Sequence, residues 1–158
     1  MRRTTFLSAL SAIALAGGLS SCSIGYDYRW NKAAASAQTT SPATLLGAWE
    51  GTWRSEATGH TGTLRAVVTA PSGESTPSRY TFRYEPVWKQ VLRVALTAEH
   101  EAKRKGSHGP WILSGEKDLG LLGGVYRFTG TATPTDFRAS YASRVDHGVF
   151  EMKRPAKK

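Results

Sequence analysis

Four histidines are the side chains in this sequence whose type best suits metal binding or general acid–base chemistry. They are scattered along the chain, each beside glycine or charged residues: His60, His100, His108 and His147. No two of them have the spacing that would bring both to one face of a helix, and none belongs to a Cys-x-x-Cys frame, so a zinc site is unsupported. We therefore expect four solvated histidines in loops, and no metal ion.

The carboxylates form only a minimal pattern. Glu116 and Asp118 lie two residues apart, which places both on one face of a strand. Asp146-His147-Gly148 fits a type I turn with Asp leading and Gly following. The glycine-rich segment 120–124 fits a bulged hairpin, because it lacks the lysine and the following helix of a phosphate-binding loop. We expect no catalytic residue, no cofactor and no enzyme activity.

The only cysteine, Cys22, directly follows an apolar segment, and a single cysteine excludes an intrachain disulfide. Residues 1–5 include two arginines and no acid, and residues 6–19 carry no charge. This order of basic, apolar and small residues is typical of an export signal. The apolar stretch of about 14 residues is too short for a bilayer core, which needs ~20. We predict a signal peptide over residues 1–21, cleaved between Ser21 and Cys22.

Leu19-Ser20-Ser21-Cys22 resembles the lipobox of bacterial lipoproteins, which is roughly Leu, two small residues and Cys. The resemblance implies a diacylglyceryl thioether on Cys22, cleavage before it and acylation of the new amine. The first partner it implies is therefore a lipid membrane, which several acyl chains hold firmly. In a host with two membranes, Ser23 implies delivery to the outer membrane, at its periplasmic face. The alternative is an ordinary signal peptide with a chance cysteine.

Residues 22–45 join this expected anchor to the rest of the chain. They are rich in Ala, Ser and Thr and have no sustained apolar period, so they cannot fold alone, and we interpret them as a lipidated N-terminus with a flexible tether. The segment 26–30, Tyr-Asp-Tyr-Arg-Trp, interrupts this composition. It is either an aromatic patch at the membrane interface or on the domain, or a docking motif for a partner.

Residues 46–155 alternate apolar and polar residues in eight segments separated by turn residues, and residues 156–158 form a basic tail. This pattern, without a helical period, predicts an all-β antiparallel meander. Closing it into an eight-stranded up-and-down barrel hides the sheet edges, and a two-sheet β-sandwich is the alternative. The residues expected on the inner face are Trp49, Trp53, Leu64, Ala66, Val68, Tyr80, Phe82, Tyr84, Trp88, Leu92, Val94, Leu96, Trp111, Leu113, Tyr126, Phe128, Phe137, Ala139, Tyr141, Phe150 and Met152.

Three short motifs resemble those of the lipocalins and other calycins. Gly47-Ala48-Trp49 repeats as Gly51-Thr52-Trp53 on the first segment, and Thr135-Asp136-Phe137 enters the seventh. The resemblance implies a compact barrel closed by Trp49, Trp53 and Arg154, with Arg154 packing over the first-strand tryptophan by a cation–π contact. It also implies a ligand in the interior. The segment is shorter than a typical lipocalin, and the helix expected after the last strand is absent from the pattern.

The aromatic inner face suggests a first hypothesis, a non-enzymatic barrel that binds a small apolar or amphipathic ligand. The candidate pocket residues are Tyr80, Phe82, Tyr84, Trp88, Tyr126, Phe128 and Tyr141.

A second hypothesis is an envelope interaction or assembly protein that uses a basic outer surface and holds no internal ligand. The formal net charge is +9, and the expected outer face carries many arginines. An anionic envelope component is the partner this charge suggests, because export argues against nucleic acid. The basic residues concerned are Arg65, Arg79, Arg83, Arg93, Arg127 and Arg138, with the predicted loop 103–105.

Overall fold

The computed structural model describes residues 25–36, 44–72, 78–89, 92–106, 108–122 and 124–156. The predicted signal peptide, its cleavage site at Ser21 and Cys22, and the last two residues of the predicted tail lie outside this range. Residues 25–36 form a helix. The elements that follow are β1 Gly47–Ser55, β2 Thr61–Thr69, β3 Arg79–Trp88, β4 Leu92–Arg93, β5 Leu96–Arg104, β6 Trp111–Asp118, the 3₁₀ turn η1 Gly120–Leu122, β7 Val125–Ala132, β8 Asp136–Ala142 and β9 His147–Lys153.

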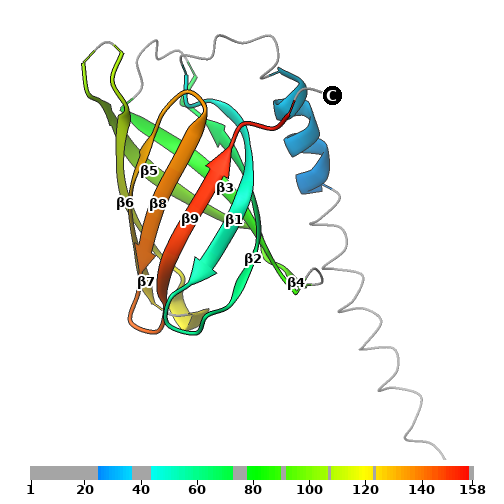
Figure 1. Cartoon of the computed structure of the whole chain (residues 1–158), viewed down its shortest axis with the longest axis vertical. Coiled ribbons are helices and arrows are strands. Elements are labelled where there is room, and N and C mark those ends of the chain that lie inside the picture. Colours follow the sequence, from blue (N-terminus) through cyan, green and yellow to red (C-terminus); the bar gives the residue numbers. More distant parts are fainter. Residues whose placement is uncertain are drawn as a thin grey trace, which may run out of the picture.

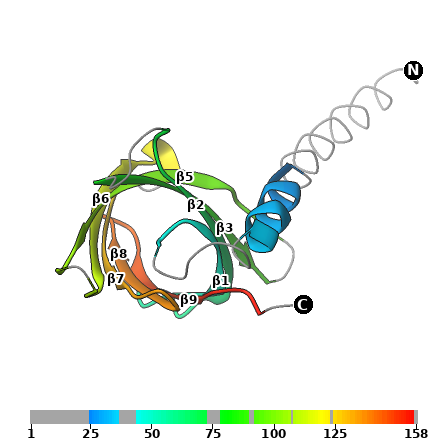
Figure 2. The same ribbon diagram turned by 90° about the horizontal axis from the view of Figure 1, so that it is seen from above.

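Eight of these strands close into an antiparallel up-and-down barrel (Figures 1 and 2). Each long strand pairs with the next one along the chain, and β9 pairs with β1, which leaves no free edge in the ring. The two-residue strand β4 is an extra that pairs only with β3. The predicted barrel is confirmed, and the continuous pairing excludes the β-sandwich.

The fourth predicted segment, over residues 88–96, is wrong. Trp88 is the last residue of β3, and the fourth wall strand of the barrel is β5, which begins only at Leu96. The inward positions of β5 are Ala98, His100 and Ala102, which lack the large apolar side chains of the other strands. Two of them are alanines, and Ala98 is paired directly with the large Phe82 of the neighbouring β3, whereas His100 is polar. Alternation of size and hydrophobicity therefore could not reveal this strand.

The two ends of the barrel are called the lower and the upper end, and each is defined by the strand connections that it holds. The lower end holds the connections β1–β2, β3–β4–β5, β6–β7 and β8–β9, and the upper end holds β2–β3, β5–β6, β7–β8 and the entry and exit of the chain (Figure 1). The predicted loop 103–105 begins inside β5, at the upper end. The apolar residues Leu92 and Val94, which we expected inside, are exposed at the lower end.

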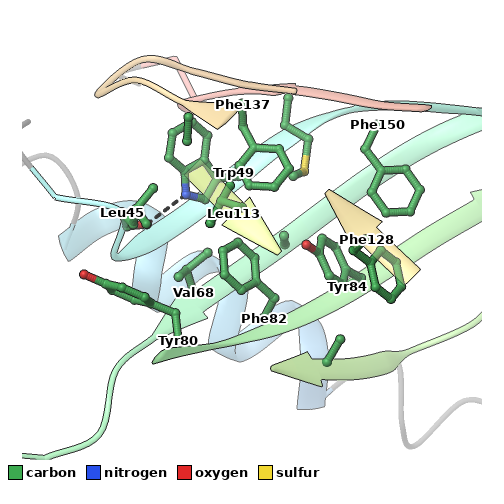
Figure 3. Close-up of a cluster of buried hydrophobic side chains, with 14 of the residues drawn as sticks. Leu45, Trp49, Val68, Tyr80, Phe82, Tyr84, Leu113, Phe128, Phe137 and Phe150 are labelled. Carbon is green, nitrogen blue, oxygen red and sulfur yellow. Dashed lines mark hydrogen bonds between the residues drawn. The ribbon is translucent and has the colours of Figure 1, made fainter. Parts of the chain in front are cut away.

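The core is a column of inward rings (Figure 3). Phe82 of β3 meets Phe137 of β8 across the barrel with ring centroids 5.7 Å apart, and Tyr84 meets Phe150 at 5.5 Å. Leu45, which we assigned to the tether, is fully buried in the same cluster. Its carbonyl accepts a hydrogen bond from the ring nitrogen of Trp49 at 3.0 Å. The domain thus begins at least one residue earlier than its composition indicates.

Residues 25–36 were expected to be part of a flexible tether, but they form a helix against the outer wall of the barrel (Figure 2). Alanine is the strongest helix former, and a short helix becomes stable when one face is buried against another element. Tyr26 is that buried face, with its hydroxyl donating to the carbonyl of Arg83 at 3.0 Å. Of the two interpretations of the aromatic segment, the structure supports a patch that rests on the domain.

Candidate functional site

The upper end contains the closure that the lipocalin resemblance implies. The guanidinium of Arg154 lies 3.8 Å from the ring centroid of Trp49, so the expected cation–π contact is confirmed. The same guanidinium donates to the carbonyls of Leu46 at 2.8 Å and Pro134 at 3.2 Å. Burial lowers the pKa of Arg154 to about 10, and it stays charged at neutral pH. Arg154 therefore ties the entry and the exit of the barrel together.

Trp53 belongs to the lower end and is only partly buried. Its ring nitrogen donates to the carbonyl of Val87 at 3.4 Å. The position beside it must be glycine, because a Cβ on Gly62 would stand 2.7 Å from that nitrogen and still closer to the Val87 carbonyl. Trp53 thus packs between β1 and β3 at the rim and has no contact like that of Trp49 with Arg154.

The predicted pocket residues fall into three groups. Phe82, Tyr84 and Phe128 lie in the middle of the barrel, where Phe82 stacks on Tyr84 at 5.6 Å and Tyr84 on Phe128 at 6.4 Å. Tyr80 is buried near the upper end. Trp88, Tyr126 and Tyr141 are near the lower end, where the two tyrosines stack at 6.0 Å. Contacts between rings thus run in a continuous row through Phe82, Tyr84, Phe128, Tyr126 and Tyr141, where a ligand was expected.

The prediction of four solvated loop histidines is wrong for His100. It points into the barrel from β5 with 3% of its surface exposed. Its Nε2 lies 3.0 Å from the Tyr84 hydroxyl, and its ring meets Phe82 edge-on at 4.6 Å. Its Nδ1 has no hydrogen-bond partner among the described residues. Burial lowers the pKa of His100 from 6.5 to about 4, so the ring is neutral at physiological pH.

The buried His100 makes stability fall in acid. Below pH 6.5 the unfolded chain binds a proton that the folded chain accepts only near pH 4, so stability is lost as the pH falls through this window. The full loss is on the order of 3 kcal/mol. Urea unfolding at pH 7 and at pH 4 should show it in the wild type, and His100→Gln should lack this part of the pH dependence. Equal pH dependence in both proteins would contradict the assignment.

The other histidines and carboxylates do not converge. His60 contacts the edge of the Trp88 ring at the lower end, and His147 is exposed at the start of β9. Asp118 accepts a hydrogen bond from the Gly120 amide at 2.7 Å, which holds the η1 turn. Among the described residues, no group of three or more His, Cys, Asp or Glu side chains is arranged to hold a metal ion.

Asp146 joins two hairpins at the lower end. Its carboxylate accepts hydrogen bonds from Ser55 of β1 at 2.6 Å and from Tyr141 of β8 at 3.0 Å. The predicted turn led by Asp146 is wrong: the turn spans residues 143–146, where the Ser143 amide donates to the Asp146 carbonyl at 2.7 Å, and His147 and Gly148 belong to β9. Both oxygens of the Asp146 carboxylate are already hydrogen-bonded within the protein. This arrangement fits a structural role in holding the two hairpins together and not that of a general base.

The outer wall is less positive than its arginines alone indicate. Three of them face carboxylates on neighbouring strands: Arg79 and Glu101, Arg127 and Glu116, and Arg138 and Glu151, at 3.6, 3.7 and 3.4 Å. The Glu116 of the predicted carboxylate pair is one of these partners. Exposed pairs of this kind contribute little to stability, but they do neutralise the wall locally. Exposed lysines also lie at the upper end, namely Lys103 and Lys105.

The buried ionic cluster between helix and barrel is a feature that the sequence does not reveal. Glu85 faces outward from β3 and is 1% exposed. Arg65 of β2 pairs with Glu85 at 2.6 Å and with Asp27 of the helix. The same guanidinium lies 5.4 Å from the ring of Tyr26 and 5.2 Å from that of Trp30. Arg65 is therefore surrounded by two carboxylates and two aromatic rings.

The lower end also has an apolar groove with a volume of about 380 Å³. It is lined by Trp53, His60, Pro86, Trp88, Leu92 and Val94. The Lys89 ammonium lies over the Trp88 ring at 4.6 Å, at the border of the groove. Sequence alternation placed Trp88 in the barrel wall, but the turn after it directs the chain to β4 at the rim.

Comparisons with protein-family models, curated proteins and solved structures found no match to this chain. The closed barrel and the contact between Trp49 and Arg154 are two features of the structure that the resemblance inferred from the sequence also implies. In the part of the chain that the structure describes, no helix is long and apolar enough to cross a membrane.

Proposed function

We propose that this chain is a lipid-anchored lipoprotein of the bacterial cell envelope. Its compact, lipocalin-like barrel works without catalysis, through contacts between its surface and other envelope components. The proposal that the barrel acts through its surface is supported by its interior, where Phe82, Tyr84 and Phe128 contact one another. Small eight-stranded barrels either fill completely or hold one small ligand, and rings in mutual contact favour the filled kind.

The lipid anchor is supported by the residues before the helix. Cys22 follows an apolar segment without charge and three residues of lipobox type. Its acyl chains would hold the protein at the periplasmic face of the outer membrane in a host with two membranes. In that compartment the exposed Lys103 and Lys105 would meet anionic envelope components and not nucleic acid.

The second candidate function is binding of a small apolar or amphipathic ligand. The lower-end groove favours it, because Trp53 and Trp88 form an open aromatic surface there. A groove of about 380 Å³ is at the small end of the usual range for ligand sites. A ligand would bind at this rim and not in the middle of the barrel, where the rings fill the interior.

Mass spectrometry of protein extracted from membranes tests both proposals. We expect an intact mass that begins at Cys22 and includes the added acyl groups, and a native mass without a bound molecule. A bare thiol at Cys22, or cleavage elsewhere, would contradict the anchor. A co-purified apolar molecule that is lost in Trp88→Ala would favour the ligand function over the interaction function.

Cys22→Ser should abolish acylation and release mature protein from washed membranes into the soluble fraction. The reason is that the proposed attachment depends on the acyl chains, which require the Cys22 thiol. Ser21→Ala is the matched control, because it keeps a small residue at the cleavage site and should stay in the membrane. Processed Cys22→Ser protein that still sediments with membranes would contradict lipid anchoring.

A further inference from the structure

Exposed apolar side chains gather at one end of the barrel. In the described part of the chain, five of the large exposed apolar residues lie on connections of the lower end or at the first residue of a strand there: Leu92, Val94, Leu121, Val125 and Val145. They come from three separate connections, so their common location is a product of the fold. Large apolar side chains that are exposed together at one end of a domain are candidates for contact with a protein or a membrane.

The helix is linked to this end through Arg93 of β4. Asp27, near the start of the described helix, lies 3.6 Å from Arg93, the neighbour of the exposed Leu92. Three residues later, Trp30 donates a hydrogen bond to the carbonyl of Trp49 near the upper end, at 3.2 Å. The described helix therefore runs along the outer wall toward the upper end, with Asp27 on the side of β4 (Figure 1).

The docked helix also sets how far the anchor can be from the barrel. Cys22 is five residues before Asp27, a separation that spans at most about 18 Å when fully extended. Without the docked helix, the chain from Cys22 to the start of the barrel would reach about 80 Å by the same rule. A lipid on Cys22 must therefore keep the bilayer surface close to β4.

We infer that the lower end of the barrel rests on the lipid bilayer, with its apolar tips in the headgroup region and its upper end turned away from the membrane. This inference rests on the lipid anchoring proposed above. A bilayer is the expected binding surface because the acylated Cys22 and the apolar tips would both lie at this end of the barrel. Apolar side chains of an interfacial segment enter the headgroup and acyl boundary by ~5–10 Å.

The charges around the tips fit this occupant. Lys89, Lys117 and Arg144 are exposed among the apolar tips and suit anionic headgroups. The acids of the same end are engaged within the protein: Glu56 pairs with Arg54, Glu116 with Arg127, and Asp118 accepts a hydrogen bond from the η1 turn. Trp88 and Lys89 also combine the amphipathic ring and the cation that are common at membrane interfaces.

Single fluorescent labels can test this orientation in the complete lipoprotein. A lipidated Cys22 has no free thiol, so an introduced cysteine is the only site that reacts with a thiol-specific dye. Leu92→Cys and Val145→Cys place the dye on the lower tips. Ile112→Cys is the matched control, because Ile112 is 48% exposed, as against 50% for Leu92, and lies on β6 near the upper end. The proteins are reconstituted into vesicles of phosphatidylethanolamine and phosphatidylglycerol that contain an acyl-chain quencher.

We expect quenching of the dye at positions 92 and 145 to exceed that at position 112 by at least about twofold, since only the tips would enter the interface. Equal quenching at all three positions, or stronger quenching at 112, overturns the orientation while the anchor stands. Wild-type protein labelled at Cys22 by the same dye would show a free thiol, and it would overturn both the anchor and the orientation.

Discussion

Replacing Trp49 by alanine should lower the free energy of unfolding by about 3–5 kcal/mol. The side chain is fully buried, and its ring contacts Phe137 at a centroid distance of 5.9 Å. Removing it leaves a cavity where the chain enters the barrel and a buried Leu45 carbonyl without its donor. It also leaves the half-buried guanidinium of Arg154 without its aromatic partner. Urea unfolding followed by circular dichroism measures the loss.

The matched control is Trp53→Ala, which removes the same side chain from the rim. Trp53 is only partly buried, so its loss should be smaller than that of Trp49. A double-mutant cycle of Trp49→Leu with Arg154→Gln, which remove the ring and the cation, isolates the contact between them, and we expect a coupling of about 1 kcal/mol. A loss below about 1 kcal/mol for Trp49→Ala would show that this ring is not part of the core.

Arg65→Ala should destabilise the protein by about 3–5 kcal/mol, because it leaves Glu85 buried without its counter-charge. Glu85 is 1% exposed and pairs with Arg65 at 2.6 Å, and the more distant Arg93, at 3.6 Å, is a poor replacement. The same change removes the cation that holds Asp27 and lies beside the rings of Tyr26 and Trp30. We therefore expect the helix to lose its contact with the barrel.

Two measurements separate this effect from general loss of stability. Urea unfolding gives the total, and trypsin cleavage after Arg29 and Lys32 reports opening of the helix alone. Cleavage should speed up about tenfold or more, since each 1.4 kcal/mol of local opening energy is a factor of ten. Arg79→Ala is the control, because its pair with Glu101 is exposed and should contribute less than about 1 kcal/mol. Unchanged cleavage in Arg65→Ala would mean that the cluster does not hold the helix.

The same variant bears on the membrane orientation. If Arg65 holds the helix on the wall, its loss converts the short connection from Cys22 into the long tether that the composition of residues 22–45 first suggested. The dye on Leu92→Cys should then be quenched less in the Arg65→Ala background, although the protein stays anchored. In the proposed arrangement, anchoring depends on Cys22, whereas orientation depends on Arg65 and the tips.

Most strands of the barrel could be predicted because a strand is recognised from the pattern of neighbouring residues in the sequence. Alternation of apolar and polar residues in the segments of β1, β2, β3 and β6–β9 reports directly which face of a strand is buried. The contact of Arg154 with Trp49 was also accessible, since strand phase and the lipocalin likeness both point to it. The alternation did not reveal β5, because its inward residues are two alanines and His100.

By itself, the sequence determined the alternating strands, the turns between them and the signal-like start that ends at Cys22, because each depends on neighbouring residues only. The tertiary structure decided what depends on distant segments. Rings from β3, β7 and β9 meet in the middle of the barrel. His100 and Glu85 are buried because other elements cover them, and residues 25–36 are helical because the wall provides a surface for Tyr26. The burial of a side chain depends on which distant segments pack against it, so the residues next to it in the sequence could not predict it.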